Sequence, residues 1–371
     1  MSDPPPERSL LDGPFRLSRF AYVRPDADAF VLESPRTAAR MTLSSPAALG
    51  LLFQLRTPTT LAALLDGHPP AVRETIAAIV RALEAHEMLT AAGPGAGEDD
   101  GPLRYWDFHD LLFHARSRLG RAHRPVGGTY RFGEGPAPGP EAKRYAEADA
   151  IPLARPDKDA VRATDPAFVE VAERRRSTRT FGPPLALDRL GAFLFRTCRV
   201  KAGGQRRPYP SGGATYPLEA YLVVDAVDGL APGLYHYDAA GHALAPLPAD
   251  AGRLASARAA AGRALGTDAV PPVLLCFTAR LGRTAHKYES IAYNLILKEV
   301  GGLYQTLWLT AAAMDLAACA VGVGDADLLA GLLGTDYYAE PSVGEFVLGT
   351  MPDGGAGPPA SDDLGSGAPR A

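Results

Sequence analysis

The chain has 371 residues, enough for about two to three domains whose cores need neither disulfide bonds nor a metal. Hydrophobic residues make up 46% and charged residues 22%, and the formal net charge is −4, which disfavours nucleic acid as a partner. The three isolated cysteines, Cys198, Cys276 and Cys319, have no CxxC spacing and argue against a zinc or iron–sulfur site, so no metal is expected.

Residues 1–28 predict an N-terminal tail that lacks the basic and apolar segments of an export signal, so the protein is expected in the cytoplasm. Residues 29–92 predict a small α+β unit with strands over 29–34 and 38–43, a helix capped by Ser44 or Ser45, and an amphipathic helix over 70–86. This order is close to a winged helix. Because the unit carries five Arg against five acidic residues, we expect it to bind peptide or protein, or merely to pack, and not to bind DNA.

Residues 93–160 predict a linker with a helical segment at 103–120. His109 and His114 on that segment are five residues apart and would face different sides of a helix, which does not suit a shared metal ion. The longest apolar run, 303–321, contains Gln305 and Asp315. It therefore predicts a buried helix and no membrane span.

Residues 161–350 predict the main domain, in which strands and helices alternate in an α+β or α/β arrangement. The expected helices cover 167–181 and 188–198, and residues 288–316 predict one long helix, or two with a weak point at Gly301–Gly302. The expected strands cover 220–225, 273–278 and 344–350. Residues 351–371 predict a disordered tail rich in glycine and proline.

Several common chemistries lack their motifs. The chain has no G-x-G-x-x-G spacing, no glycine followed by lysine, no G-x-S-x-G and no HExxH. A Rossmann dinucleotide site, a P-loop, a serine-hydrolase elbow and a zinc protease site are therefore disfavoured.

Two polar segments suggest a bound phosphate-bearing, flat ligand. Residues 173–181 contain four arginines within six positions, together with Ser177 and Thr178, and guanidinium groups suit a phosphate monoester. The alternative is a solvated basic helix end. Residues 209–221 contain Ser211, Gly212 and Gly213 before a strand, where small residues allow the backbone to approach a ligand closely.

Together these segments resemble the FMN-dependent nitroreductase family. Within it, residues 210–224, 233–238, 286–322 and 332–350 are similar to the SagB-type branch, the azoline (thiazoline/oxazoline) dehydrogenases of peptide maturation. The resemblance implies an α+β, nitroreductase-like FMN-binding fold. Such a fold has a central mixed or antiparallel sheet flanked by helices and a long dimer helix, and here a winged-helix-like unit precedes it.

The resemblance also implies a set of site residues. Those that would bind the FMN phosphate and ribityl chain are Arg175, Arg176, Ser177 and Arg179. Those that would line the flavin ring are Ser211, Gly212, Gly213 and Ala214, and the turn from Ala318 to Gly322 would approach the pyrimidine edge. Ala214 stands where many relatives have Asn, and residues 299–306 lack the His and Asn that many azoline dehydrogenases carry there.

The implied reaction is the oxidation of thiazoline or oxazoline rings to thiazole or oxazole in a ribosomal precursor peptide. Lys287, in its neutral form, would remove the acidified proton while hydride leaves to flavin N5, and Tyr288 would orient the substrate or relay the proton. The implied partners are the precursor peptide, a cyclodehydratase of the same pathway and a second copy of the chain. Three alternatives stay open: an NAD(P)H-dependent reductase of nitro or quinone compounds, a dehydroamino-acid reductase, and a non-catalytic scaffold for a peptide-modifying complex.

Overall fold

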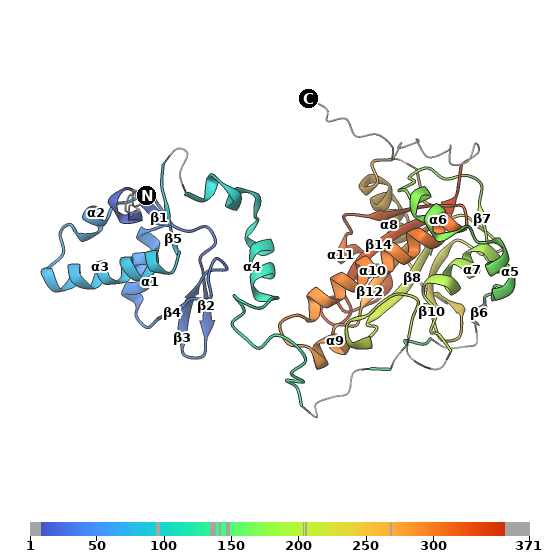
Figure 1. Cartoon of the computed structure of the whole chain (residues 1–371), viewed down its shortest axis with the longest axis horizontal. Coiled ribbons are helices and arrows are strands. Elements are labelled where there is room, and N and C mark those ends of the chain that lie inside the picture. The colour runs from blue at the N-terminus through green and yellow to red at the C-terminus, as the bar shows by residue number, and fades with distance from the viewer. Residues whose placement is uncertain are drawn as a thin grey trace, which may run out of the picture. The chain divides into compact units, whose positions relative to one another are not determined.

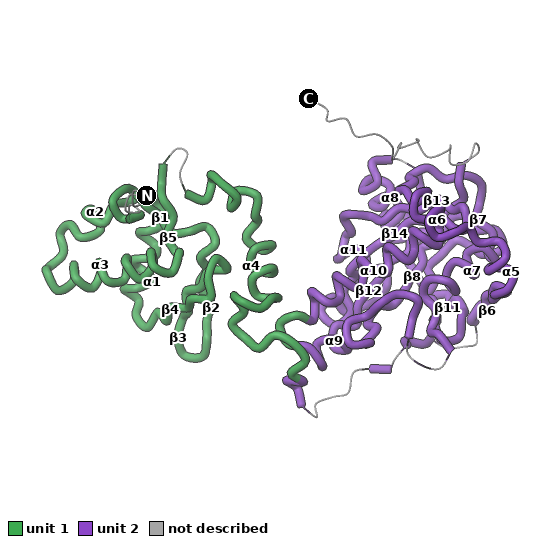
Figure 2. The backbone as a smooth tube through the Cα atoms, viewed as in Figure 1, with its two compact units in different colours: residues 1–129, 289–291 green, residues 130–288, 292–371 purple. Residues whose placement is uncertain are grey.

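The computed structural model describes residues 9–93, 97–133, 139–140, 142–145, 149–202, 204, 206–267 and 269–352. The chain divides into two compact units, shown in different colours in Figure 2. Unit 1 comprises residues 1–129 and 289–291, and unit 2 comprises residues 130–288 and 292–371. The division after residue 129 falls inside the segment that the sequence predicts as a linker. The tail predicted over 351–371 lies outside the described residues from 353 onward.

The described part of unit 1 combines two small antiparallel sheets with short helices. One sheet pairs β1 (Phe15–Leu17) with β5 (Leu89–Ala91), and the other has the order β2 (Tyr22–Asp26), β3 (Ala29–Glu33), β4 (Arg40–Leu43). The helices are α1 (Pro46–Gln54), α2 (Leu61–Leu65), α3 (Pro70–Ala85) and α4 (Phe108–Arg116). Strands β1 and β2 lie in the segment predicted as an N-terminal tail, so residues 15–26 of that segment are part of the folded unit.

Local capping chemistry sets the start of helix α1 in unit 1. The Ser45 hydroxyl accepts the Ala48 N–H at 3.4 Å, and Pro46 occupies the first turn of α1. The apolar faces of α1 and α3 then meet the sheets in one core, whose buried members include Phe15, Leu32, Leu52, Leu55, Val80 and Leu83. The predicted strands over 29–34 and 38–43 and the predicted helix over 70–86 are confirmed within a few residues.

Unit 2 is built on a seven-stranded sheet in which every neighbouring pair of strands is antiparallel (Figure 1). The strand order is β13 (Leu316–Val321), β14 (Ser342–Thr350), β12 (Val273–Ala279), β8 (Leu218–Val224), β10 (Gly233–Asp238), β11 (Ala243–Leu247), β6 (Ile151–Pro152). A separate parallel pair joins β7 (Leu185–Ala186) to β9 (Val227–Asp228). The helices are α5 (Lys158–Thr164), α6 (Phe168–Arg174), α7 (Leu187–Thr197), α8 (Ala251–Ala264), α9 (Leu281–Lys287), α10 (Ala292–Ala313) and α11 (Ala326–Leu333).

The two faces of this sheet bury different helices because strand side chains alternate with a period of two. On β8, Leu222 and Val224 belong to the core that includes Leu307 of α10. Tyr221 and Val223 belong to the opposite core, with residues of α8 and α11. Strands β14, β12 and β8 are buried along their whole length or nearly so, which explains why their apolar runs were recognisable in the sequence. The expected α+β architecture with helices on both faces of a sheet is confirmed.

Three predicted elements are wrong in extent. The helix predicted over 167–181 ends at Arg174, because Arg175 adopts φ −59° and ψ 119° and the chain continues extended. The segment predicted over 288–316 forms a single helix, α10, which starts only at Ala292, ends at Ala313 and runs unbroken through Gly301–Gly302; the separate helix α9 ends before it, at Lys287. Residues 318–322, predicted as a turn, mostly form β13.

No helix within the described ranges has both the length and the apolar composition needed to span a membrane. The 22-residue α10 instead buries one side against the sheet and carries the charged pair Lys298–Glu299.

Candidate functional site

The arginine segment (residues 174–181) leaves α6 and runs beside strand β13. The Thr178 N–H donates to the Ala318 carbonyl at 2.9 Å, which joins this segment to the predicted Ala318–Gly322 stretch. The Arg175 guanidinium lies 5.5 Å from the centre of the Trp308 ring on α10. Within the described parts of the chain, Arg175, Arg176 and Arg179 have no carboxylate partner at ion-pair distance. Their positive charge is therefore available to an anion.

The Ser-Gly loop (residues 211–216) contains one position, Gly213, whose backbone leaves no room for a side chain. Gly213 has φ +62°, in the left-handed region, inside the single turn of 3-10 helix over 212–214. A Cβ atom added to Gly213 would lie 2.3 Å from the Tyr288 hydroxyl oxygen and 2.9 Å from Lys287 Nζ. The fold thus brings the predicted flavin loop and the predicted catalytic pair into contact, although 74 positions separate Gly213 from Lys287 in the printed sequence.

Helix α9 holds the Lys287–Tyr288 pair against this loop. Lys287 is the last residue of α9, and the Tyr288 N–H closes the final turn by donating to the Thr284 carbonyl at 2.9 Å. Two contacts join α9 to the loop: the hydroxyls of Thr284 and Thr215 lie 3.1 Å apart, and Arg283 Nε donates to the Thr215 carbonyl at 2.9 Å. The pair was predicted at the start of the long helix. It lies instead at the end of a separate short helix, and both side chains are half-buried.

One residue with no predicted role is central to the loop. Glu299 of α10 is only 4% exposed, and its Oε2 lies 2.5 Å from the Ser211 hydroxyl oxygen. Burial raises the pKa of Glu299 to about 7, although the Ser211 hydrogen bond and the positive charges of Arg207 and Arg283 act in the opposite direction. The sequence offered one signal for it, an acidic residue within the apolar pattern of a long helix.

The residues predicted for the phosphate and those predicted for the ring contact α10 at two different places. Arg175 contacts α10 at Trp308 and Ser211 contacts it at Glu299, nine residues away, which corresponds to about 13 Å along a helix axis. Gly322, at the end of β13, is exposed. One chain therefore presents the phosphate-binding candidates and the ring-binding candidates at separate places.

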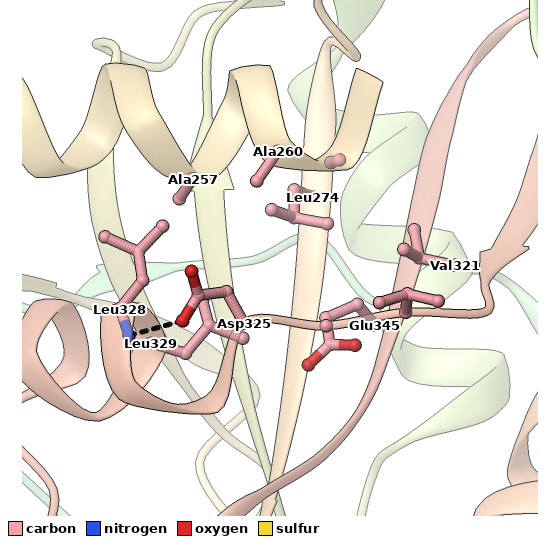
Figure 3. Close-up of a pocket in the computed structure, with 11 residues that line it drawn as sticks. Ala257, Ala260, Leu274, Val321, Asp325, Leu328, Leu329 and Glu345 are labelled. Carbon is pink, nitrogen blue, oxygen red and sulfur yellow. Dashed lines mark hydrogen bonds between the residues drawn. The ribbon is translucent and has the colours of Figure 1, made fainter. Parts of the chain in front are cut away.

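A small apolar pocket lies elsewhere in unit 2, between α8 and α11 (Figure 3). Its hollow measures about 270 Å³ with its open mouth included. The Asp325 carboxylate accepts the Leu328 N–H at 2.9 Å, and burial raises the pKa of Glu345, another lining residue, to about 7. Of the stretches predicted for the site, only Ala318–Gly322 reaches this pocket, through Val321, and the pocket lining includes no basic side chain.

The described residues contain one group of potential metal ligands, formed by Asp107, His109 and Asp110, and all three are exposed. His114 is not part of the group; its ring lies 5.4 Å from that of Trp106. Exposed acidic groups of this kind are common without an ion, and we assign no metal site to them.

Two family models match the chain in consecutive parts. Residues 15–123 match the model of the cyanobactin oxidase ThcOx, and residues 172–352 match the model of the nitroreductase family. The first match begins inside the segment that the sequence predicts as a tail, in agreement with the strands β1 and β2 found there.

A nitroreductase-type protein of Methanocaldococcus jannaschii is 30% identical over 175 residues, which cover 47% of this chain and 85% of that protein. The microcin B17-processing protein McbC of Escherichia coli is 31% identical over 118 residues, which cover 31% of this chain and 43% of McbC, so less than half of McbC's length is matched. A solved structure of a nitroreductase-type protein from Ralstonia eutropha superposes with a TM-score of 0.47 and 22% identity, and covers 62% of this chain and 99% of that one.

Proposed function

The chain belongs to the nitroreductase family, and from that premise we propose that it is an FMN-dependent azoline dehydrogenase of ribosomal peptide maturation. It would oxidise peptide thiazoline or oxazoline rings to thiazole or oxazole. The match of residues 15–123 to a cyanobactin oxidase and the likeness to McbC support a peptide substrate. The observation that carries the proposal is the contact of Lys287 and Tyr288 with Gly213, since an amine and a phenol beside the proposed flavin loop are the groups that the proton transfer would need.

The residues present fit FMN on two counts. Among the residues that the structure describes, no carboxylate pairs with Arg175, Arg176 or Arg179, so the arginine segment can offer its charge to a phosphate group. The backbone at Gly213 has no room for a side chain, as a surface that approaches a flat ring requires. Ser177 would complete the phosphate contacts, Ser211, Gly212 and Ala214 would line the ring, and the backbone of Gly322 would approach its pyrimidine edge. Bound FMN supplies an acceptor for hydride.

Lys287 and Tyr288 would divide the proton chemistry between them. The ring carbon next to the peptide carbonyl carries an acidified hydrogen, and the Lys287 amine would take it as a proton at Nζ. The Tyr288 hydroxyl, next to Nζ on the same side of the loop, would orient the substrate or relay that proton. The substrate ring loses two hydrogens in total, one as this proton and one as hydride from the neighbouring carbon.

Incubation of a cyclised precursor peptide with the protein tests this function directly. We expect each azoline ring to lose two hydrogen atoms, measured by mass spectrometry, and the purified protein to be yellow and to release FMN on denaturation. Oxidation of NADH without any peptide, together with an unchanged peptide mass, would favour a nitro, quinone or dehydroamino-acid reductase. The likeness to the Methanocaldococcus jannaschii protein makes that reductase the second candidate. A colourless protein that releases no FMN would favour the third alternative, a non-catalytic scaffold for a peptide-modifying complex.

The proposed partners follow from the same activity. Unit 1 would contact the precursor peptide or the cyclodehydratase that forms the azoline rings, and no contact with nucleic acid or membrane is proposed. The cytoplasm is the proposed location, in keeping with three cysteines that are all buried and free.

We expect a homodimer, in which a second copy would bring an arginine segment to a Ser-Gly loop. Exposed apolar residues on α6 and α10 would lie in the interface: Phe168, Val169, Tyr293 and Leu297. Sedimentation of the FMN-bound protein should give the mass of two chains. A monomer that retains FMN would contradict this.

Mixed dimers test whether the arginine segment and the Ser-Gly loop combine across chains. An Arg175→Ala/Arg179→Ala chain and a Gly213→Val chain should each bind little FMN alone. Refolded together in equal amounts, they should regain about a quarter of the wild-type FMN content, because half of the dimers would hold one intact site. No recovery on mixing would place both segments of a site in the same chain.

A further inference from the structure

The Ser211 side chain connects the two ends of the Ser-Gly loop to α10. Its hydroxyl oxygen accepts the Tyr216 N–H at 2.9 Å, so its proton is left to donate elsewhere. That proton is donated to Glu299 Oε2, which lies 2.5 Å from the hydroxyl oxygen. Backbone bonds inside the loop, from Ala214 N–H to the Ser211 carbonyl at 3.1 Å and from Thr215 N–H to the Gly212 carbonyl at 3.4 Å, complete the turn.

Glu299 has unusual surroundings for an acidic residue. Its second oxygen, Oε1, is buried and has no hydrogen-bond partner in the described chain. The charged and titratable groups that act on it are Arg207, Arg283 and Tyr209. The pKa of Arg207 is raised and that of Tyr209 lies well above 10, so neither changes charge between pH 5 and pH 9. The hydrogen bond from Ser211 is therefore the one that stabilises the buried Glu299 side chain, and it also fixes the position of the Ser211 hydroxyl.

We propose that Glu299 is a positioning residue for the cofactor: its carboxylate accepts the Ser211 hydroxyl proton and thereby holds the Ser-Gly loop in the shape that presents the Gly212–Gly213 backbone. The inference deepens the proposed function and rests on it. Gly212 also lies close to α10, since a Cβ atom added there would be 3.2 Å from the Leu295 side chain. The loop is thus fixed to α10 by packing at Gly212 and by the charged hydrogen bond at Ser211.

The proposal gives FMN affinity a pH dependence whose sign is opposite to that of stability. As the pH rises through about 7, Glu299 ionises, the hydrogen bond from Ser211 becomes charge-assisted, and FMN should bind more tightly. The folded protein holds this proton more tightly than the unfolded chain, so the same ionisation lowers stability as the pH rises from about 4.5 towards 7. A purely structural glutamate would make affinity and stability change together.

The test compares the FMN dissociation constants of wild type and Glu299→Gln at pH 5.5 and pH 8.5 by flavin fluorescence. Glutamine resembles the protonated acid, so we expect about five- to tenfold weaker binding than wild type at pH 8.5 and equal binding at pH 5.5. The FMN phosphate itself titrates near pH 6, and the comparison between the two proteins removes that effect. Ser211→Ala should weaken binding as much as Glu299→Gln at pH 8.5, and the double variant should be no weaker than either one.

Glu345→Gln is the matched control, because Glu345 is also a buried acid whose pKa burial raises to about 7, but it lies on β14 at the pocket between α8 and α11. It should leave FMN affinity unchanged at both pH values. Equal affinities of wild type and Glu299→Gln at pH 8.5, or an equal loss in Glu345→Gln, would overturn the proposal.

Hydrogen exchange of the Tyr216 amide provides a readout that needs no FMN. Its protection at pH 8.5 should fall in Glu299→Gln and Ser211→Ala and stay unchanged in Glu345→Gln. If wild type binds no FMN but this pattern is found, the proposed function fails while the loop contact stands. Unchanged protection in Glu299→Gln would refute the positioning role by itself.

Discussion

Replacement of Lys287 by alanine should slow oxidation of an azoline-containing peptide by about 10²–10⁴-fold, the usual loss when a general base is removed. The protein should stay folded, dimeric and yellow. The reason is that Lys287 Nζ lies beside Gly213 at the end of α9, whereas the proposed phosphate contacts lie on the arginine segment. Single-turnover oxidation of a cyclised precursor, followed by mass spectrometry, measures the chemical step separately from FMN binding.

Tyr288→Phe should reduce the same rate with FMN content unchanged, because only the hydroxyl that lies against Gly213 is removed and the ring remains. Lys298→Ala is the matched control: Lys298 is one of the five lysines, it is exposed on α10, and it should retain nearly the full rate. If Lys287→Ala retains near-wild-type turnover on an authentic cyclised substrate, the proposed base is wrong. The reductase reading, in which the flavin alone carries the chemistry, would then take precedence.

Loss of FMN is the second large effect we expect, from Arg175→Ala and Arg179→Ala. Each truncation removes a charge-assisted contact to phosphate, typically about 1.5 to 3 kcal/mol, which corresponds to at least tenfold in affinity. The double variant should lose about a hundredfold or more if the two contacts are independent. Flavin absorbance of the protein after exhaustive dialysis, with the folded state checked by circular dichroism, measures the effect.

Arg174→Ala provides the control for this charge, since Arg174 belongs to the same run but ends α6 as an exposed residue and is not among the residues implied by the resemblance. It should retain FMN. Arg175→Lys separates charge from shape, because lysine keeps the positive charge but lacks the planar group that lies over Trp308. Full FMN retention in both alanine variants would mean that the arginine segment is a solvated basic chain end with no ligand.

Local signals in the sequence were sufficient to predict the fully buried strands and the helices with a clear N-terminal cap. The fully buried strands β8 and β12 appear as apolar runs rich in Val and Leu. The start of α1 is predicted by the capping residue Ser45 followed by Pro46. The alternation of such elements, with the motifs around Ser211 and Arg175, was enough to predict the α+β fold and the candidate site residues. Strands β10 and β11, which carry His, Tyr and Pro, gave weaker patterns and were not predicted.

Only the tertiary structure decided where helices stop and which distant residues meet. Arg175 leaves the helix although its neighbours favour one, and the next residues run beside β13, where Thr178 binds the Ala318 carbonyl. The contact of Gly213 with Tyr288 and that of Ser211 with Glu299 join segments that are 75 and 88 positions apart. The sequence by itself therefore determined the elements and the candidate residues, because capping and apolar periodicity act over a few positions. The pairing of those residues depends on how the sheet and α10 pack, which no local pattern encodes.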